Sequence, residues 1–537
     1  MIVRGEAGDR YPWEPITLAQ QLARTAAAHP DRDALVFEDR RLSWADTQVE
    51  VTRVARALRA AGVERGDHVA VWVPNHIEWI LLWLGANAIG AVIVAVNTRY
   101  KTEEVSYIVR QSDARLLVMV DEFVGIDYLA MLARLRDADL PELRGVVVIG
   151  DAPPDTQSWD AFLGAGSPDA QIEADAVAYD DPSFIVYTSG TTGYPKGAVH
   201  SSRVLRNECS ISEAMDIDAS SRVMNHMPFF HIAGACTGVL PPLITGGAMI
   251  LMERWDPAHA FELIERERVT VLSGIPTHFI DLLNHEALET ADVSSLTTGW
   301  IGGANNPPEV IQAIVDRLGM KGILPVYGMT ETTSITTIPK LDDPPELIAS
   351  GKGFPVSDFE LKVVDAVSGA ELDAGVEGEV CVRGHLVMQG YYENPEATHA
   401  VIDDDGWFHT GDLGEFDASG YLAITGRKSD MFIVGGSNAY PAEIERALSE
   451  HPAIKQAYVV GVPDARLGEV GFAFVELRRD AELDRAGVTE FCKGRLADFK
   501  VPRHIEFVTE WPLTATGKIQ RFLLRERAED AGREVSR

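Results

Sequence analysis

Basic residues are scarce in this chain compared with acidic ones. It has 48 lysines and arginines against 81 aspartates and glutamates, giving a formal net charge of -33 at pH 7. Proteins that bind DNA, RNA or anionic membranes draw their affinity from clustered Lys and Arg, so we expect no such partner. Because salt screens charges beyond roughly 8 Å, a local basic pocket for a small anion is still compatible with this composition.

Cysteine is also rare. The four cysteines are scattered, with no C-x-x-C pair and no metal-ligand spacing: Cys209, Cys236, Cys381 and Cys492. This usage is typical of a reduced protein of the cytoplasm. The first ten residues contain no apolar signal-peptide core, and the last four form no peroxisomal or lipidation motif. We therefore expect a cytoplasmic location.

Long apolar runs are few, and one of them has the length of a membrane span. Trp79 to Val96 contains no charged residue. However, Gly85, Asn87 and Gly90 interrupt the run, and its last six residues are rich in β-branched side chains. We therefore predict a buried helix followed by a buried strand, with no transmembrane segment.

The length of 537 residues is too great for one hydrophobic core, so at least two domains are expected. Strand-like runs, such as 68–73, 116–120 and 248–252, alternate with helical ones such as 44–61. This alternation predicts parallel sheets with helices packed on their faces. The segment 151–181, rich in Pro, Gly, Ala and Asp, is predicted to be a connector.

The pattern of predicted secondary structure changes twice toward the C-terminus. Residues 359–382 read as strands and turns, which predicts a small β subdomain, and the rest mixes helices with strands. The predicted fold class is therefore α/β: a large N-terminal domain of parallel α/β sheets with a small β subdomain, followed by a small α+β domain. We place these domains at residues 1–428 and 429–537. A helix of the second domain should begin at Pro441.

A stretch from Tyr187 to Gly197 has the composition of a phosphate-binding loop. It holds glycines, Ser and Thr hydroxyls and Lys196 directly after a strand-like run. Glycines let backbone amides close on an anion, hydroxyls donate to its oxygens, and a lysine adds charge. The stretch is not the G-x-x-x-x-G-K-[ST] loop, since a glycine follows the lysine, and this disfavours a mechanical or signalling NTPase. A plain surface loop is the alternative.

Further motifs follow in order along the chain. They are Gly302-Gly303-Ala304, Tyr327-Gly328-Met329-Thr330-Glu331, Gly411-Asp412, Arg427 and Gly517-Lys518. Each taken alone admits a plainer explanation: a turn, a solvated glutamate, an Asx turn or an exposed lysine. Together with T-S-G-T-T-G-x-P-K-G at 188–197, however, they resemble the motifs of the adenylate-forming superfamily, which includes acyl-CoA synthetases, luciferases and peptide-synthetase adenylation domains.

The resemblance implies ATP and Mg²⁺ as ligands and a role for each motif. The implied contacts with the phosphates are Thr188, Ser189, Gly190, Thr191, Thr192, Gly193 and Lys196, with Thr330 bonded to the α-phosphate. Adenine would contact Gly302, Gly303, Ala304 and a stacking Tyr327, and the ribose would contact Asp412 with Arg427. Gly328 and Met329 are further implied nucleotide contacts. It implies that Glu331 holds Mg²⁺. It further implies that Lys518 bridges the carboxylate and the α-phosphate, delivered by a small domain that is mobile about a hinge at Ser429.

The second half of the implied reaction uses coenzyme A. The resemblance implies that Gly435 and Gly436 let its pantetheine arm pass. Met227-Pro228-Phe229-Phe230-His231 is similar to the family motif that borders the acyl pocket and the thiol tunnel. His231 is thus a candidate catalytic residue beside Thr330, Glu331 and Lys518, with a structurally satisfied histidine as the alternative. The candidate acyl-pocket residues are His231, Ala233, Gly234, Ala235, Trp300 and Gly328.

The resemblance implies an acyl-CoA synthetase, which turns a carboxylate, ATP and CoA into acyl-CoA, AMP and pyrophosphate through an acyl adenylate. Gly328 stands where acetate-specific relatives carry a pocket-filling tryptophan, so we predict a medium- or long-chain, branched or cyclic hydrophobic acid. The alternatives are a ligase that loads a carrier protein, an aryl-CoA ligase and, more distantly, a non-catalytic nucleotide-binding protein. Relatives are often dimers, so a homodimer is a further expectation.

Overall fold

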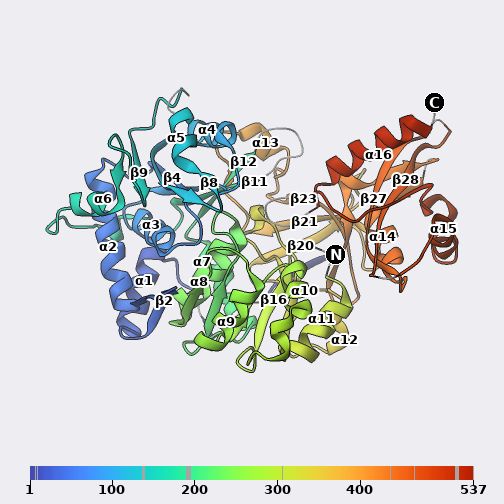
Figure 1. Cartoon of the computed structure of the whole chain (residues 1–537), viewed down its shortest axis with the longest axis horizontal. Coiled ribbons are helices and arrows are strands. Elements are labelled where there is room, and N and C mark those ends of the chain that lie inside the picture. The colour runs from blue at the N-terminus through green and yellow to red at the C-terminus, as the bar shows by residue number, and fades with distance from the viewer. Residues whose placement is uncertain are drawn as a thin grey trace. The chain divides into compact units, whose positions relative to one another are not determined.

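The computed structural model describes residues 1–537 except 7, 9, 12, 136–138, 189–194, 305, 436, 465, 480, 514–518 and 536–537. The chain divides into two compact units. The large unit comprises residues 3–360 and 382–408, and the small unit comprises residues 1–2, 361–381 and 409–537. Figure 1 shows the chain with its elements labelled.

Two mostly parallel sheets form the frame of the large unit. The eight-stranded sheet has the order β10 (Gln157–Ser158), β9 (Gly145–Ile149), β6 (Ala114–Val120), β4 (His68–Trp72), β5 (Val92–Ala95), β11 (Pro182–Thr188), β12 (Lys196–Ser201) and β22 (Gly390–Tyr391). The seven-stranded sheet has the order β17 (Gly322–Val326), β16 (Thr298–Gly302), β15 (Val271–Leu272), β13 (Arg222–Asn225), β14 (Ala248–Leu251), β2 (Asp33–Phe37) and β3 (Arg40–Ser43). Among the described strands of these two sheets, β12, β22 and β3, at one end of each sheet, pair antiparallel to their neighbours, and the others pair parallel with one another.

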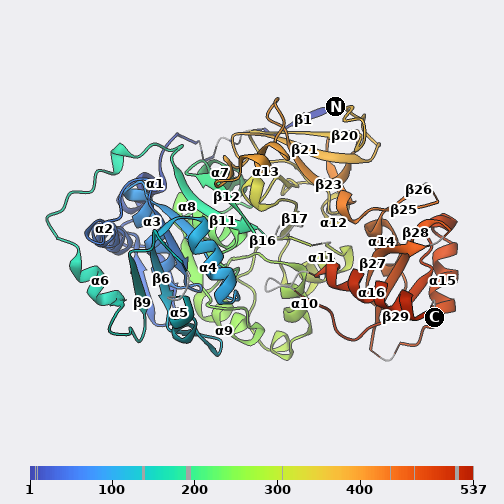
Figure 2. The same ribbon diagram turned by 90° about the horizontal axis from the view of Figure 1, so that it is seen from above.

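A layer of helices lies between the two sheets. Helix α3 (Ile77–Ala88) packs on β5 and β11, α8 (Gly238–Thr245) packs on β13 and β14, and α1 (Leu18–Ala28) contacts both helices. Every residue of α3 is buried, as expected for a helix covered on all sides. Figures 1 and 2 show α4 (Thr102–Gln111) and α5 (Tyr128–Leu135) on the face of the eight-stranded sheet opposite α3.

The remaining elements of the large unit cover these layers. Its other α-helices are α2 (Trp44–Ala60), α6 (Trp159–Ala165), α7 (Val204–Ala214), α9 (Pro257–Glu267), α10 (Pro276–Asn284), α11 (Pro308–Ala313), α12 (Pro345–Ala349) and α13 (Pro395–His399). Short ladders join β7 (Glu122–Phe123) to β8 (Ile126–Asp127) and β18 (Thr337–Ile338) to β19 (Phe354–Pro355). Single-turn π-helices occupy Ala233–Thr237 and Ile314–Leu318.

Local sequence explains where several helices begin. At the start of α2, the Ser43 hydroxyl accepts from the Asp46 amide, and the Asp46 carboxylate accepts from the Ser43 amide. This reciprocal pair is the capping box that satisfies amides left over at a helix start. Helix α9 has Asp256 in the capping position and proline as its first residue. Such signals fix the ends of the helices that support the strands.

Most of the residues in two further strand systems, together with three α-helices, belong to the described part of the small unit. One sheet has the order β1 (Ile2–Arg4), β20 (Phe359–Val364), β21 (Gly378–Gly384), β23 (Phe408–Phe416) and β24 (Leu422–Arg427). The other joins β26 (Ser437–Ala439), β25 (Phe432–Val434), β28 (Gly468–Leu477) and β27 (Ile454–Asp464), with β29 (His504–Phe507) added to β28. The helices are α14 (Pro441–Ser449), α15 (Arg485–Lys493) and α16 (Arg521–Val535).

The predicted fold class is confirmed, and the apolar run at 79–96 is indeed a buried helix followed by a buried strand, α3 and β5. Among the described residues, no helix is long and apolar enough to cross a membrane. The prediction of a connector at 151–181 was incomplete, because β10 and α6 lie within it. Helix α6 is short, capped by Ser158, and buries Phe162 and Leu163, too few positions to produce a periodic pattern. The domain boundary at residue 428 stays a prediction.

Candidate active site

The carboxyl ends of two parallel strands bring two of the predicted motifs together. Strands β16 and β17 pair so that Gly302 lies opposite Val326, the last residue of each strand. Gly303-Ala304 and Tyr327-Gly328 therefore leave the sheet side by side. Strand β13 ends at Asn225 on the same edge, just before the motif that ends at His231. Ligands of α/β proteins collect at this edge, so the geometry suits a bound substrate.

Glycine is required by close packing at two of these positions. A Cβ on Gly302 would lie 2.7 Å from the Val326 carbonyl oxygen, and one on Gly328 would lie 1.8 Å from that of Ser334. Gly303 adopts a φ of +76°, which side chains rarely tolerate. The close packing of the backbone therefore requires glycine at residue 328, independently of the effect that we predict for this glycine on the acyl pocket.

The predicted phosphate loop joins β11 to β12. These strands pair antiparallel, with Thr188 opposite Lys196, so the two ends of the loop are held together by the sheet. Residues 189–194, which include the predicted contacts Ser189, Gly190, Thr191, Thr192 and Gly193, lie outside the described part of the chain. The structure thus positions the first hydroxyl of the motif and its lysine.

A tyrosine links the lysine of this loop to the predicted Mg²⁺ carboxylate. The Lys196 Nζ atom lies 5.2 Å from the centre of the Tyr391 ring, and the Tyr391 hydroxyl donates to Glu331 Oε1 at 2.8 Å. The three side chains come from β12, from β22 beside it, and from the turn after β17. A cation and a carboxylate therefore flank one neutral ring, which suits a site for a polyphosphate and a divalent cation.

Tyr391 was not among the site residues predicted from the sequence. Burial, followed by the nearby Glu331 charge and the hydrogen bond to it, raises the pKa of the Tyr391 hydroxyl far above its ordinary value, so the group stays a donor. The sequence shows only a glycine followed by two tyrosines. The pairing of β22 with β12, across nearly 200 positions of sequence, is what brings the ring to Lys196.

The Tyr391→Phe variant should bind Mg-ATP less well. Loss of one hydrogen bond to a carboxylate, worth about 1.5 kcal/mol, should raise the KM for Mg-ATP about tenfold. Steady-state kinetics with varied Mg-ATP would measure this. Tyr392→Phe is the matched control, because that hydroxyl donates to Asp113 at 2.9 Å instead. Equal KM values for the two variants would contradict the role of Tyr391.

Two residues in left-handed conformation follow the Y-G-x-T-E motif. Thr333 has a φ of +58° and Ser334 a φ of +85°, conformations that cost side-chain-bearing residues energy. Asn207 of α7 holds this turn by donating from Nδ2 to the carbonyl oxygens of Thr333, at 2.7 Å, and Ile335, at 3.2 Å. Helix α7 thus fixes the backbone directly after Glu331. Such strain is characteristic of functional turns.

His200 is a buried neutral group beside this motif. Burial lowers its pKa to about 4, and a hydrogen bond with the Thr330 backbone only partly opposes that effect. The unfolded chain, with a His pKa near 6.5, binds the proton first as pH falls, so stability is lost from about pH 6.5 down to about pH 4.

We expect the free energy of unfolding to fall by about 2 kcal/mol between pH 7 and pH 5 because of His200 alone. Urea denaturation at the two pH values would measure this, and His200→Gln should remove that share of the loss. An equal pH dependence in the variant would show that His200 does not cause it.

The predicted acyl-pocket residues lie on and around the π-helix. Ala233 and Ala235 are buried there, and the Gly234 carbonyl accepts from the Asn225 amide at 3.0 Å. A Cβ on Gly234 would lie 2.2 Å from the Pro228 carbonyl oxygen, so this glycine also serves a tight turn. His231 is half-buried just before the π-helix, at its amino end. Single π-turns inserted in helices are frequent at functional sites.

Trp300 lies on β16 at the same edge of the seven-stranded sheet. It is 3% exposed, and its backbone amide donates to the Ser273 hydroxyl at 3.1 Å. Phe229 of the aromatic motif, by contrast, belongs to the core, where its ring packs 5.1 Å from that of Trp79. Phe229 of this motif therefore belongs to the hydrophobic core, whereas His231 lies next to the π-helix.

In the small unit, the predicted ribose pair is joined. Asp412 on β23 lies opposite Arg427 on β24, and Arg427 Nε is 3.0 Å from Asp412 Oδ1. The Asp412 side chain is 6% exposed, whereas that of Arg427 is 60% exposed. The adjacent Lys428 forms an ion pair with Glu379 at 3.0 Å. The buried Asp412 carboxylate is thus held by the Arg427 guanidinium, which is exposed to solvent.

The two other predicted sites of the small unit are described only in part. Gly435 adopts a φ of +57°, and its amide donates to the Leu467 carbonyl at 2.7 Å; Gly436 lies outside the described residues. Lys518 also lies outside them. Its flanks are described: Leu513 and Ile519 form a β-bridge, and the Gln520 amide donates to the Pro512 carbonyl at 2.8 Å.

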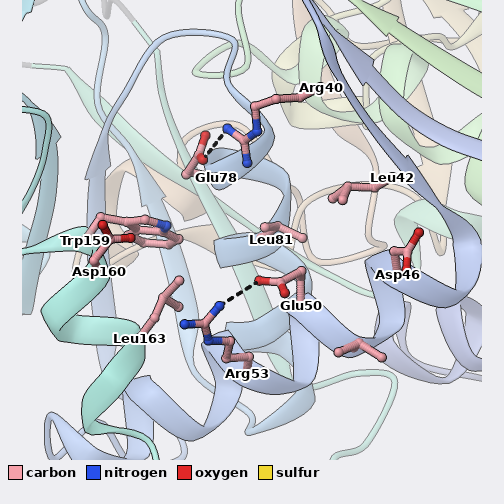
Figure 3. Close-up of a pocket in the computed structure, with 11 residues that line it drawn as sticks. Arg40, Leu42, Asp46, Glu50, Arg53, Glu78, Leu81, Trp159, Asp160 and Leu163 are labelled. Atoms are coloured by element: carbon pink, nitrogen blue, oxygen red, sulfur yellow. Dashed lines mark hydrogen bonds and ion pairs between the residues drawn. The ribbon is translucent and has the colours of Figure 1, made fainter.

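A cavity of about 500 Å³ lies away from all these motifs, between α2, α3 and α6 (Figure 3). Arg40 pairs with Glu78 in it at 2.7 Å, and Arg53 lies 3.6 Å from Glu50. The two arginines of this cavity thus already have partners of opposite sign, unlike a site that is preset for an anionic ligand.

The fold and the motifs at the sheet edge define an adenylate-forming enzyme. The sequence profile of the AMP-binding enzyme family matches residues 22–392, and that of the AMP-binding enzyme C-terminal domain matches residues 443–518. The chain therefore belongs to the AMP-binding enzyme family. Its activity is that of an AMP-forming, ATP-dependent acid–CoA ligase.

Two curated relatives and one solved structure are similar over nearly the whole chain. A CoA ligase of Mycobacterium tuberculosis, named for a propanoyl group on a methyl-dioxo-octahydro-indenyl ring system, is 40% identical over 95% of this chain and 98% of its own length. The human mitochondrial medium-chain acyl-CoA ligase ACSF2 is 35% identical over 96% and 88%, respectively. The anthranilate CoA ligase AuaEII, solved with anthranoyl-AMP, superimposes with a TM-score of 0.86 at 28% identity over 96% and 98%.

Proposed function

We propose that this enzyme activates a hydrophobic carboxylic acid larger than acetate and transfers it to CoA. The observation that carries the proposal is the set of Lys196, Tyr391 and Glu331 beside the joined ends of β16 and β17. It offers one lysine and one carboxylate at the edge where substrates of α/β proteins bind. The family membership supplies the type of reaction.

Glu331 fits the needs of Mg²⁺, which binds through one or two carboxylates together with phosphate oxygens. The metal supplies charge neutralisation for the reacting phosphates. Glu331 has one oxygen oriented by Tyr391, and its backbone carbonyl accepts from the Met388 amide at 2.8 Å. We infer that Lys196 and Thr330 bind phosphate oxygens, and that Asp412, held by Arg427, accepts from the ribose hydroxyls.

Adenylation joins two anions, the carboxylate and the α-phosphate. We infer that Lys518 neutralises the charge that grows there, a type of electrostatic effect that often dominates catalysis. The acid's oxygen bonds to the α-phosphorus and pyrophosphate leaves. In the second step the CoA sulfur bonds to the activated carbonyl carbon and AMP leaves. Gly435 and Gly436 are the proposed passage for the pantetheine arm, and His231 the group at the thiol tunnel.

The acid is proposed to have a medium-length, branched or cyclic body. The support is that one relative is named for a medium-chain acid and another for a bicyclic propanoate that carries two oxo groups. An aryl acid, as in the anthranilate ligase, is the second candidate. Trp300 has the largest side chain among the candidate acyl-pocket residues.

A cytoplasmic location and a homodimer are also proposed. The first is supported by composition, since the four cysteines are few and all buried. The second stays a prediction, which analytical ultracentrifugation would test.

Pyrophosphate and AMP release with ATP, Mg²⁺, CoA and a panel of acids tests the proposal. The panel should run from acetate to long-chain, branched, bicyclic and aryl acids. We expect AMP, pyrophosphate and acyl-CoA, with little turnover of acetate. Release of ADP, or transfer only to a carrier protein, would contradict the proposal.

A further inference from the structure

One buried acidic side chain has no structural explanation. Glu208, on α7, is 0% exposed, and neither of its carboxyl oxygens has a hydrogen-bond partner among the described residues. Burial raises the pKa of Glu208 well above the ordinary value and so favours the neutral carboxyl group, which can both donate and accept a hydrogen bond. A buried polar group without a partner is costly and calls for a reason.

Glu208 lies between two parts of the candidate site. Helix α7 packs on α8 and on the π-helix Ala233–Thr237. Within that π-helix, burial first and then the proximity of Glu208 raise the pKa of Cys236, which places the carboxyl group near the predicted acyl-pocket residues. The preceding residue, Asn207, holds the turn after Glu331. Glu208 is thus on a helix that packs on the predicted acyl-pocket residues, and it is one residue from Asn207, which holds the turn after the predicted Mg²⁺ carboxylate.

The local packing does not need a carboxyl group at this position. Among the neighbours of Glu208 along the helix, Val204, Leu205 and Ile211 are apolar and buried. The buried Ser212 hydroxyl donates to the Glu208 backbone carbonyl at 2.6 Å and not to its carboxyl group. A leucine would match this face without leaving polar atoms unsatisfied. The chain nevertheless has glutamate, and groups that are perturbed in this way gather at functional sites.

We propose that Glu208 determines substrate specificity by hydrogen-bonding a keto or hydroxyl oxygen carried by the hydrophobic body of the acid, away from its reacting carboxylate. This rests on the proposed function and narrows its substrate class to acids with a polar oxygen in an otherwise apolar body. A site built to bond a polar group rejects the analogue that lacks it, because the protein group then stays unpaired.

Matched pairs of acids test the proposal. Each pair has the same carbon skeleton with and without a keto group, and the pairs include straight chains, with the ketone at successive positions, and ring-bearing acids. For the wild type, kcat/KM should be about tenfold or more higher for the best keto acid than for its parent. Glu208→Gln, which keeps donors and an acceptor, should retain the preference, whereas Glu208→Leu should abolish it while turning over the parent acid.

A stability measurement separates this role from a structural one. Glu208→Leu should unfold at the same temperature as the wild type or higher, because it removes buried unpaired oxygens. Glu213→Leu, on the same helix, is the control and should leave the preference unchanged. The proposal is wrong if the wild type prefers no keto acid, or if Glu208→Leu slows both acids of a pair equally. Absence of turnover with every acid would instead overturn the proposed function.

Discussion

Lys518→Ala should slow acyl-adenylate formation by about 10²- to 10³-fold. Removing a single group that stabilises transition-state charge typically has an effect of this size. The thioester step should be nearly unchanged, because the resemblance to the family assigns Lys518 to the first half-reaction alone. Acid-dependent exchange of labelled pyrophosphate into ATP measures the first step. Acyl-CoA formation from a synthetic acyl adenylate and CoA measures the second.

Lys493→Ala is the matched control for this variant. Lys493 ends α15 in the same unit, its side chain is 57% exposed, and its distance to Glu490 is 4.0 Å. Its loss should change neither half-reaction. Slowing of both half-reactions by the Lys518 variant would contradict a role confined to adenylation. Equal effects of both lysine variants would point to a general effect of charge.

Glu331→Gln should lower kcat/KM for Mg-ATP by about 10²- to 10³-fold. The variant keeps the shape of the side chain, and the Tyr391 hydroxyl can still donate to the amide oxygen. It removes only the negative charge that a hard cation needs. Raising the Mg²⁺ concentration should restore part of the activity if weaker metal binding is the cause. Titrations of activity with Mg²⁺ at fixed ATP would show this shift.

Glu346→Gln is the control for Glu331. Glu346 is exposed in the first turn of α12, so the variant makes the same chemical change outside the site. It should leave the Mg²⁺ dependence unaltered. Wild-type activity of Glu331→Gln would remove the carboxylate from the mechanism. Its ordered contact with Tyr391 would then need another explanation.

Most of the large unit could be predicted because its strands are short apolar runs between helical patterns. The run at 79–96 was resolved correctly from its glycines and β-branched residues, since these mark the change from helix to strand. Helix α14 begins at Pro441, where a first helical proline was expected. Helix α6 was missed because its two turns bury only Phe162 and Leu163.

The candidate site was predictable wherever a motif is contiguous in sequence. Tyr327 to Glu331 does follow a strand, and Asp412 does meet Arg427. Tyr391 could not be found, because its contact depends on pairing between β12 and β22. Glu208 left one readable signal, an acidic residue on a helix whose buried residues include the apolar Val204, Leu205 and Ile211. Its lack of partners becomes visible only once the surrounding helices are packed.

Helix α7 carries two adjacent side chains with different tasks. Asn207 holds the strained turn that follows Glu331, and Glu208 is proposed to hydrogen-bond an oxygen of the acid. Some substitutions of residue 208 that are selected for a new acid preference should therefore also weaken Mg²⁺ binding. Bulky replacements that displace the helix would weaken the hydrogen bonds from the Asn207 amide to the turn after Glu331, and so weaken Mg²⁺ binding. Replacements of matched volume would change only the preference for the acid. Variants selected for a new acid should for this reason be screened for their Mg²⁺ requirement as well.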